Sequence, residues 1–384
     1  MPSAIKNEWQ VGILFSRSGI AEVTESEHFR GTVLAIEEIN AAGGVLGNRI
    51  APICYDPKSS PYEYRRCADR LLMEDGVKII FGCMMSASRK AILGSLERRN
   101  GLLWYPANYE GFEYSPNVLY TGAAPNQHTL QLARYIVSRI GKDVMLVGSD
   151  YIFPRETNRV LRQLFEAAGG RIVDEVYVAV QPDATATRRV IDRIKRDRPA
   201  AVVSTIIGRG TELFYRMYRD AGLDPRSLPV GSLSLAETEA STIGAACCAG
   251  HFTAATYFAS VTTSASLRFR EAFAARFGDG EQCSFYSESA YNQVHLFAAA
   301  LERAGTDDPE KVVAAAGGVE FEAPQGWITI DADNNHTWLH SRIGVLDENG
   351  QFDIVWEAGE PVKPDPYLIS HALECYSLDE RMPH

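Results

Sequence analysis

Short apolar runs alternate with longer stretches of helical periodicity along the first two thirds of the chain. The runs are rich in Val, Ile and Leu and are expected to form strands at 11–15, 50–55, 77–81, 102–105, 144–148, 171–178, 200–205 and 228–232. Between them, apolar residues recur at three- and four-residue spacing, as at Phe29, Val33, Ile36 and Ile39, which is typical of helices. Strands that alternate with helices in this way predict parallel sheets with both faces covered.

The alternation occurs twice and therefore predicts two similar α/β lobes. The first series occupies residues 9 to about 120, and the second occupies residues 143 to about 256. The segment 119–129 lies between the two series, so we expect the chain to cross there from one lobe to the other.

The pattern changes after residue 256. Two long helical stretches are expected at 264–277 and 285–304, followed by antiparallel strands at 326–331, 341–347 and 352–357. Asn349-Gly350 separates the last two strands and predicts a hairpin. This tail is expected to complete both lobes, giving an N-terminal lobe of residues 1–124 plus 258–334 and a C-terminal lobe of residues 125–257 plus 335–384.

The predicted fold is therefore α/β, with two doubly wound parallel-sheet lobes and a ligand cleft between them. In open parallel sheets, ligands bind outside the carboxyl ends of the strands. The residues that follow each predicted strand are accordingly the candidate ligand contacts, and most of them are hydroxyl-bearing, aromatic or small.

The charge balance limits the classes of partner. The 384 residues carry a formal net charge of -11, spread along the sequence, which disfavours direct binding to nucleic acid or to an anionic membrane surface. No apolar run approaches the roughly 20 residues of a membrane span. The first residues lack the apolar stretch of a secretory signal, so a cytoplasmic location is predicted, with a periplasmic one as the alternative if a leader had been removed.

Residues suited to catalysis or metal binding are sparse. The seven cysteines include no C-x-x-C pair, so neither a zinc site nor a disulfide framework is predicted. Cys83 lies at the end of an apolar strand without a histidine and acid partner in the sequence, and is expected to be a small buried side chain. His336 is expected to be exposed in a polar turn. We predict no catalytic residue, no metal and no cofactor, and therefore no enzyme.

The stretch Ser86-Ala87-Ser88 follows a strand and precedes a helix, and it permits two interpretations. A serine there could cap the helix, or the helix N-terminus could donate hydrogen bonds to a ligand carbonyl group. The surrounding residues match neither a phosphate-binding loop nor a hydrolase nucleophile elbow. Both interpretations remain open from the sequence.

Four segments carry a resemblance to a known family: GCMMSASRK (82–90), YPANYEGFEYSPNVLYTGAAPNQ (105–127), GSDYIFPRETN (148–158) and KPDPY (363–367). They resemble the amide-sensing negative regulators of aliphatic amidase operons, and are similar to the urea and short-chain amide receptors of ABC transporters. The resemblance covers essentially the whole chain. It implies the type I periplasmic-binding-protein fold, with a ligand closed between two lobes.

The resemblance also implies ligand-binding residues. The serine after the third strand, the tyrosine of the Y-P pair and the tyrosine of S-D-Y correspond to Ser86, Tyr105 and Tyr151. Where the regulators have a threonine, this chain has Ala107 followed by Asn108. The remaining candidates near the strand ends are Met85, Phe153, Thr205, Ser232 and Ser234.

The ligand is expected to be a small uncharged amide or urea. Amino-acid receptors of the wider superfamily hold the ligand ammonium with an acidic residue at the strand end of the second lobe, where residues 231–234 are neutral in this chain. An unpaired buried charge would be costly there. The expected role is that of the regulator, which would bind an RNA-binding antitermination protein, because the first residues lack a secretory signal. The alternative is a transport receptor, which would bind an ABC permease. The resemblance also suggests a homo-oligomer, although no heptad pattern requires one.

Overall fold

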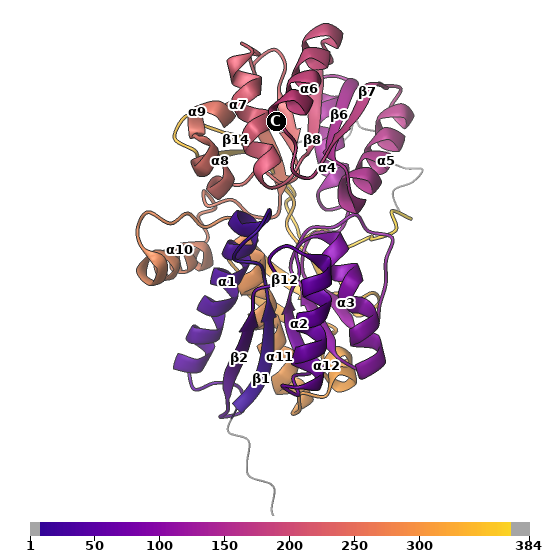
Figure 1. Cartoon of the computed structure of the whole chain (residues 1–384). Helices are drawn as coiled ribbons and strands as arrows, with labels where there is room; N and C mark the ends of the chain where they lie inside the picture. Colours follow the sequence, from indigo (N-terminus) through magenta and orange to yellow (C-terminus); the bar gives the residue numbers. More distant parts are fainter. Residues whose placement is uncertain (1–7, 370–384) are drawn as a thin grey trace, which may run out of the picture. The chain divides into compact units, whose positions relative to one another are not determined.

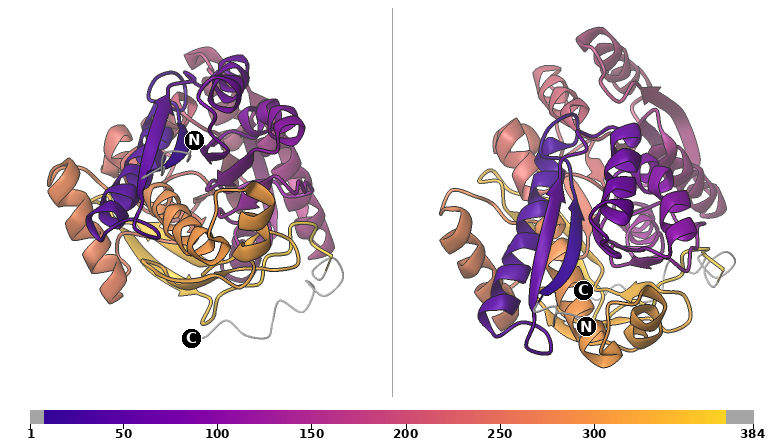
Figure 2. Two further views of the ribbon diagram at one scale, coloured as in Figure 1. Left: turned by 90° about the horizontal axis from the view of Figure 1, so that it is seen from below. Right: turned by 60° about the horizontal axis from the view of Figure 1, so that its bottom comes forward.

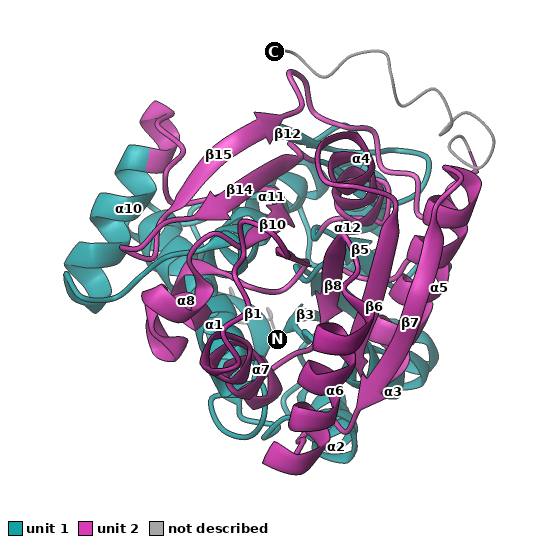
Figure 3. Cartoon of the chain, turned by 90° about the horizontal axis from the view of Figure 1, so that it is seen from above, with its two compact units in different colours: residues 1–108, 114–122, 267–338 teal, residues 109–113, 123–266, 339–384 magenta. Residues whose placement is uncertain are grey.

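The chain divides into two units, and each is built around its own mainly parallel sheet (Figures 1 and 3). The computed structural model describes residues 8–369. Unit 1 contains the chain up to residue 108 together with 114–122 and 267–338, and unit 2 contains 109–113, 123–266 and the chain from 339. The sequence predicted that the chain passes from one lobe to the other after residues 124, 257 and 334. In the structure, the corresponding passages between the units come after residues 122, 266 and 338.

The sheet of unit 1 has five parallel strands in the order β2-β1-β3-β4-β5. The strands are β1 (Glu8–Leu14), β2 (Arg49–Tyr55), β3 (Ile79–Gly82), β4 (Leu102–Tyr105) and β5 (Val118–Tyr120). Strands β3, β4 and β5 are buried along their whole length, because helices cover both faces of the sheet. This burial explains why their sequences are continuously apolar.

Helices and a small antiparallel sheet complete unit 1. The helices are α1 (Glu22–Ala41), α2 (Pro61–Met73), α3 (Ser86–Arg99), α11 (Phe285–Ala304) and α12 (Pro309–Ala316), and the small sheet contains β11 (Glu320–Ala323), β12 (Gly326–Ile330) and β13 (Thr337–Trp338). Helix α1 packs along α11, and α2 packs along α3. Helix α1 also runs beside β2 (Figure 2). The approach of α1 to α11 is close, since a Cβ atom on Gly31 would lie 2.0 Å from the carbonyl oxygen of Ser287.

The sheet of unit 2 has seven strands in the order β15-β14-β10-β9-β8-β6-β7. The strands are β6 (Asp143–Ser149), β7 (Arg171–Val178), β8 (Ala201–Thr205), β9 (Val230–Ser232), β10 (Phe252–Ala255), β14 (Arg342–Leu346) and β15 (Phe352–Glu357). The first five are parallel, and β14 and β15 add an antiparallel hairpin. Gly350 in the turn of this hairpin has a φ of 84°, as the Asn-Gly pair predicts.

The helices of unit 2 are α4 (Thr129–Arg139), α5 (Ile152–Ala167), α6 (Ala184–Asp197), α7 (Arg209–Asp220), α8 (Glu237–Ile243) and α9 (Ala245–Cys248). One further helix, α10 (Ser264–Phe277), begins in unit 2 and ends in unit 1. A core cluster under α4 and α5 includes Leu132, Leu146, Phe165 and Phe252, all at most 2% exposed.

The predicted fold class is confirmed by these two parallel-sheet units. The helical stretches 264–277 and 285–304 match α10 and α11, and the strand 171–178 matches β7. Strands β5 and β10 were missed, because each has only three or four residues and β10 includes two alanines, which give no strong strand signal. The predicted ligand cleft remains a prediction.

Candidate functional site

The turn after β3 brings candidate residues to the carboxyl edge of the sheet in unit 1. Leu14 and Gly82 end β1 and β3 as register partners, and the N–H of Cys83 donates to the carbonyl oxygen of Leu14 at 2.9 Å. Cys83 then has a φ of 65°, which is uncommon for a residue with a side chain. This turn ends the strand and leads into α3, whose first residue is Ser86.

The start of α3 decides between the two interpretations of the serine pair. Met85 occupies the N-cap position, and no side chain caps the helix. The capping interpretation is therefore wrong, because Ser86 is already the first helical residue. Met85 is 5% exposed and Ser86 is 1% exposed, so both candidates are buried at this edge.

Tyr105 ends β4 and supports the same turn. Its hydroxyl group donates to the carbonyl oxygen of Met84 at 2.6 Å. The guanidinium carbon of Arg89 lies 4.8 Å from the centroid of the Tyr105 ring, a cation–π contact. Both side chains are fully buried. Arg89 was not among the candidates, since a helical arginine is usually exposed.

Ala107 and Asn108 follow β4 in the segment that leaves the sheet. Ala107 is buried and Asn108 is partly exposed. A Cβ atom on Gly122 would lie 2.1 Å from the carbonyl oxygen of Ala107, so the 105–108 segment packs directly on the backbone that follows β5. Tyr105, Ala107 and Asn108 are thus grouped with Met85 and Ser86 at one edge of unit 1.

A buried carboxyl group joins the loops that follow β1 and β2. Oε2 of Glu25, in the first turn of α1, accepts hydrogen bonds from the N–H of Ser16 and from the hydroxyl group of Tyr64. The hydroxyl oxygen of Ser16 accepts the N–H of Ser59 at 2.7 Å and lies 3.2 Å from the Tyr64 hydroxyl oxygen. Ser16, Glu25 and Tyr64 are all fully buried.

Burial raises the pKa of Glu25 to about 7, although its hydrogen bonds from Tyr64 and Ser16 lower it. Burial also raises the pKa values of Tyr64 and Cys83 well above their usual range. Oε1 of Glu25 has no hydrogen-bond partner among the described residues. The sequence did not identify this group, because an acidic residue in a first helical turn is normally exposed to solvent and stabilises the helix dipole.

In unit 2, Tyr151 and Phe153 lie at the start of α5. Tyr151 occupies the N-cap position and is partly exposed. Phe153 is 7% exposed and belongs to the core cluster of the unit, with Leu161 and Phe165. The contacts of Phe153 with this cluster identify it as a core side chain.

Three candidate hydroxyl groups at the ends of β8 and β9 form hydrogen bonds inside unit 2. Thr205 Oγ1 lies 3.3 Å from the carbonyl oxygen of Val147 and 3.2 Å from Asn158 Oδ1. Ser232 Oγ accepts the N–H groups of Ser234 and of Leu235, both at 3.0 Å. The hydroxyl group of Ser234 donates to the carbonyl oxygen of Ile206 at 2.9 Å. Ser232 and Ser234 are thereby fixed beside the end of β8.

His336 differs from its prediction as an exposed turn residue. It is 1% exposed, and its ring stacks on the ring of Tyr120, with 4.4 Å between the centroids. Burial lowers the pKa of His336 to about 4, so the ring is neutral near pH 7. The polar residues around it suggested exposure, but Tyr120 of β5 covers it.

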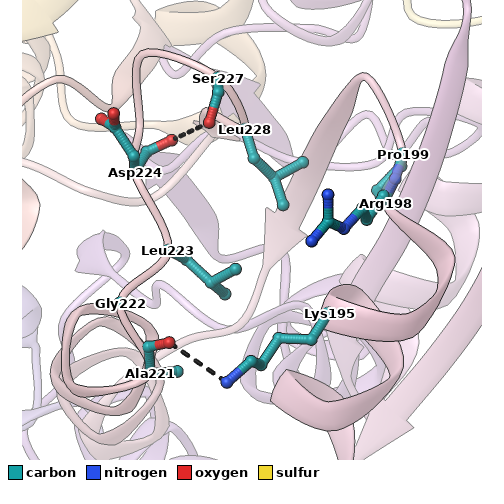
Figure 4. A pocket seen from close by; sticks show the side chains of 9 residues that line it. All are labelled: Lys195, Arg198, Pro199, Ala221, Gly222, Leu223, Asp224, Ser227 and Leu228. Atoms are coloured by element: carbon teal, nitrogen blue, oxygen red, sulfur yellow. Dashed lines mark hydrogen bonds between the residues drawn. The ribbon is translucent and has the colours of Figure 1, made fainter.

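A surface pocket of about 380 Å³ in unit 2 lies at the opposite, amino-terminal end of β8 and β9. Figure 4 shows the residues that line it. Lys195 Nζ donates to the carbonyl oxygen of Ala221 at 3.3 Å, and the Ser227 hydroxyl group donates to the backbone carbonyl oxygen of Asp224 at 3.1 Å. None of the sequence-predicted candidates lines this pocket. Its basic groups are exposed and lie near helix C-termini, where cations are favoured.

Residues 8–369 contain no group of three or more His, Cys, Asp or Glu side chains arranged to hold a metal ion. None of the described helices is both long enough and apolar enough to cross a bilayer.

The family of the chain is shown by a family model that covers nearly its whole length. A family model described as periplasmic binding protein domain matches residues 9–372. Leu/Ile/Val-binding protein homolog 6 of Brucella suis biovar 1 is 24% identical over 303 residues, which cover 77% of each chain. The leucine-, isoleucine-, valine-, threonine-, and alanine-binding protein of Pseudomonas aeruginosa is 26% identical over 320 residues, which cover 78% of this chain and 80% of the relative.

Solved structures show the same fold. A solute binding protein of an ABC transporter from Rhodopseudomonas palustris BisB5, in complex with 3,4-dihydroxybenzoic acid, has a TM-score of 0.82 and 21% identity, and the match covers 93% of this chain and 98% of that chain. The branched-chain amino acid transporter substrate binding protein LivJ from Streptococcus pneumoniae, in complex with isoleucine, has a TM-score of 0.80 and 21% identity, covering 92% and 99%.

Proposed function

Because the chain belongs to the periplasmic binding protein domain family, we propose that it is the solute-binding receptor of an ABC transporter and that its ligand is a short uncharged amide or urea. The receptor role is supported by the relatives, which are named as amino-acid-binding proteins, and by the ABC transporter receptors that share the fold. Such a receptor acts outside the cytoplasm and delivers its ligand to a permease.

The proposed ligand class is inferred from the uncharged residues at the carboxyl end of β9 in unit 2. Residues 231–234, which end β9 and begin the following loop, contain two serines and no acidic side chain. An amino-acid ligand would bring a cationic ammonium group, which needs an anionic partner when it is buried. Hydroxyl and backbone groups suit an uncharged carbonyl or amide instead.

Unit 1 would contribute hydrogen-bond donors for the carbonyl group of the ligand. Ser86 is the first residue of α3, and the N-terminus of a helix presents backbone N–H groups and a positive dipole end. We assign Ser86, Tyr105 and Asn108 to this side, with Met85 and Ala107 as apolar lining. In unit 2 we assign Tyr151 and Ser234 to the ligand. Thr205, Ser232 and Phe153 support the edge from within the unit.

Isothermal titration tests the ligand class directly. The purified protein is titrated with urea, formamide, acetamide, propionamide, butyramide, leucine and benzoate, and the same samples are assayed for ammonia release. We expect saturable binding of one neutral amide or urea without turnover. Binding of leucine or benzoate alone would contradict the proposed ligand, and ammonia release would contradict the receptor role.

A variant pair tests the assignment of Ser86. Removal of a hydroxyl group that meets the ligand is expected to weaken binding by about fivefold to tenfold in Ser86→Ala, in line with about 1 kcal/mol for a net hydrogen bond. Ser138→Ala is the matched control, because the hydroxyl group of Ser138 is exposed and bonds only locally, to the carbonyl oxygen of Tyr135 at 3.1 Å. Equal affinity in both variants would remove Ser86 from the site.

A second candidate function is cytoplasmic control of an amidase operon through an RNA-binding antitermination protein. The segments 82–90, 105–127, 148–158 and 363–367 favour it, because they resemble amide-sensing regulators. Deletion of the gene separates the two roles. Loss of uptake of labelled acetamide, with amidase synthesis unchanged, supports the receptor; constitutive or uninducible amidase synthesis with normal uptake supports the regulator.

A further inference from the structure

Glu25 has an unusual hydrogen-bond arrangement for a fully buried carboxyl group. Both of its donors, the Ser16 N–H and the Tyr64 hydroxyl group, reach Oε2, whereas Oε1 has no partner among residues 8–369. A neutral carboxyl group tolerates this arrangement better than a carboxylate, because a buried charge needs donors on both oxygens. The hydrogen-bonded arrangement of Ser16, Glu25 and Tyr64 therefore depends on whether Glu25 is protonated.

The cluster is directly connected to the candidate ligand edge of unit 1. Ser16 lies two residues beyond Leu14, whose carbonyl oxygen accepts the N–H of Cys83. The chain segments that lead to Ser16 and to Ser86 thus leave the sheet from adjacent strands, β1 and β3. The Leu14–Cys83 hydrogen bond is therefore the contact through which a change at Ser16 would reach the edge where Ser86 lies.

The loop of residues 16–21 is held by hydrogen bonds to the segment after β2. Asp56 accepts the N–H of Arg17 at 3.2 Å and the hydroxyl group of Ser18 at 2.9 Å. Ser59 accepts the N–H of Ala21 at 3.1 Å and donates to the carbonyl oxygen of Ser18 at 3.2 Å, while its own φ is 55°. Gly19 has a φ of 93°, and a Cβ atom there would lie 2.7 Å from the carbonyl oxygen of Lys58. A left-handed backbone is uncommon for a residue such as Ser59, so this conformation depends on the contacts that surround it.

The charged and titratable groups around Glu25 do not neutralise it. Tyr64 of α2 and Cys83 after β3 are buried with raised pKa values, and Asp56 after β2 adds a repulsive negative charge. On α1 itself, burial lowers the pKa of His28 to about 3, so that ring is neutral. Glu25 forms no ion pair with a described residue. Arg89 of α3 lowers the pKa of Cys83, and the guanidinium group of Arg17, in the loop itself, lies over the ring of Phe29 at 4.4 Å.

We propose that Glu25 is a positioning residue for ligand binding: the loss of its proton rearranges the loop of residues 16–21 and lowers the affinity of the protein for its neutral ligand. The protonated form is the binding form, since a carboxylate buried in this arrangement would leave its charged Oε1 without a donor, and the loop would have to rearrange to supply one. This inference rests on the proposed function, in that it concerns the same site. The consequence is that ligand affinity depends on pH near neutrality, although neither urea nor an amide changes its own charge in this range.

The test compares acetamide and urea titrations of the wild type and of Glu25→Gln at pH 6.0, 7.0 and 8.5. Glutamine has the size of a neutral glutamic acid and cannot ionise. We expect the wild-type affinity to fall about fivefold from pH 6.0 to 8.5, a modest coupling, and the affinity of Glu25→Gln to stay at the low-pH wild-type value throughout. Glu302→Gln, at an exposed position of α11, is the matched control and should follow the wild type. A wild-type affinity that is independent of pH, or the same pH dependence in Glu25→Gln, would overturn the proposal.

A second measurement does not need a ligand. Amide hydrogen exchange of Ser16 and of the loop to residue 21 is compared at pH 6.0 and 8.5, after correction for intrinsic exchange. We expect lower protection at the higher pH in the wild type and no difference in Glu25→Gln. If neither amide nor urea binds, the proposed ligand class fails; the exchange data then decide the role of Glu25, since equal protection at both pH values would refute it.

Discussion

The hydroxyl group of Tyr105 donates a hydrogen bond of 2.6 Å to the carbonyl oxygen of Met84. This bond ties the end of β4 to the turn that follows β3, where Cys83 has a left-handed backbone conformation. Tyr105 therefore supports the residues next to Ser86, in addition to any contact with a ligand. Its ring is held in turn by the guanidinium group of Arg89.

Replacement of Tyr105 by phenylalanine is expected to lower the free energy of unfolding by about 1 to 2 kcal/mol, because the Met84 carbonyl group loses a buried hydrogen bond. Ligand affinity should fall as well, since the turn before Ser86 loses a support. Urea denaturation and calorimetric titration measure the two effects. Tyr62→Phe is the control, as Tyr62 is 73% exposed, and a similar loss in both variants would contradict the role of the bond.

Stability should decrease with rising pH through Glu25. Its pKa is raised from 4.5 to about 7 in the folded protein, so the folded state holds a proton between these values that the unfolded state has lost. The contribution is fully present below pH 4.5 and disappears as the pH rises through 7, with a total of about 3 kcal/mol. We expect urea denaturation at pH 5.0, 6.0, 7.0 and 8.0 to show this slope in the difference between the wild type and Glu25→Gln.

The difference between the two proteins is the required quantity, because buried histidines act in the opposite direction. Burial lowers the pKa values of His28 to about 3 and of His128 to about 4, and both histidines are retained in Glu25→Gln. Their effects therefore cancel in the comparison. A difference that does not change with pH would show that Glu25 has an ordinary pKa.

His251 is expected to make unit 2 sensitive to acid. Its Nδ1 accepts the N–H of Val230 at 3.0 Å, and burial lowers its pKa from 6.5 to about 3. Because the folded pKa is depressed, this stability is present above pH 6.5 and is lost as the pH falls toward 3. At pH 5 the loss amounts to about 2 kcal/mol. His251→Asn, which keeps an acceptor without the titration, should lose correspondingly less stability between pH 7 and 5 in urea denaturation; an unchanged pH response would contradict the assignment.

The close packing of α1 on α11 leaves no room for a side chain at Gly31. An added Cβ atom would lie 2.0 Å from the backbone carbonyl oxygen of Ser287, and a backbone atom cannot rotate away. We expect Gly31→Ala to lower the free energy of unfolding by about 3 kcal/mol or more. Gly280→Ala is the control, since a Cβ atom there would have no atom within 4 Å and the φ of Gly280 is not left-handed. Equal melting temperatures for the two variants would show that α1 and α11 separate readily.

Helix α1 shows where sequence reasoning reached its limit. Apolar periodicity indicated a buried face through Phe29 and Val33, yet both are only partly buried, whereas Glu25, His28 and Thr32 are fully buried. Local hydropathy cannot anticipate that a polar face is buried against Tyr64, Ser16 and other groups distant in the sequence. The candidate Thr205 lies at the end of β8, as predicted, and Phe153 lies in the first turn of α5, but the contacts of both are within unit 2.

The sequence by itself determined the α/β class, the doubling of the strand and helix series, and the strand ends at which candidate residues lie. These features depend on the local periodicity of apolar residues and on short turn signals, which are written in consecutive positions. Only the tertiary structure decided that Tyr105 supports Met84, that His336 is buried against Tyr120, and that Glu25 is buried with one oxygen unpaired among the described residues. Burial and hydrogen bonding arise from residues far apart in the chain, and these long-range contacts set the pKa values and the geometry of the candidate site.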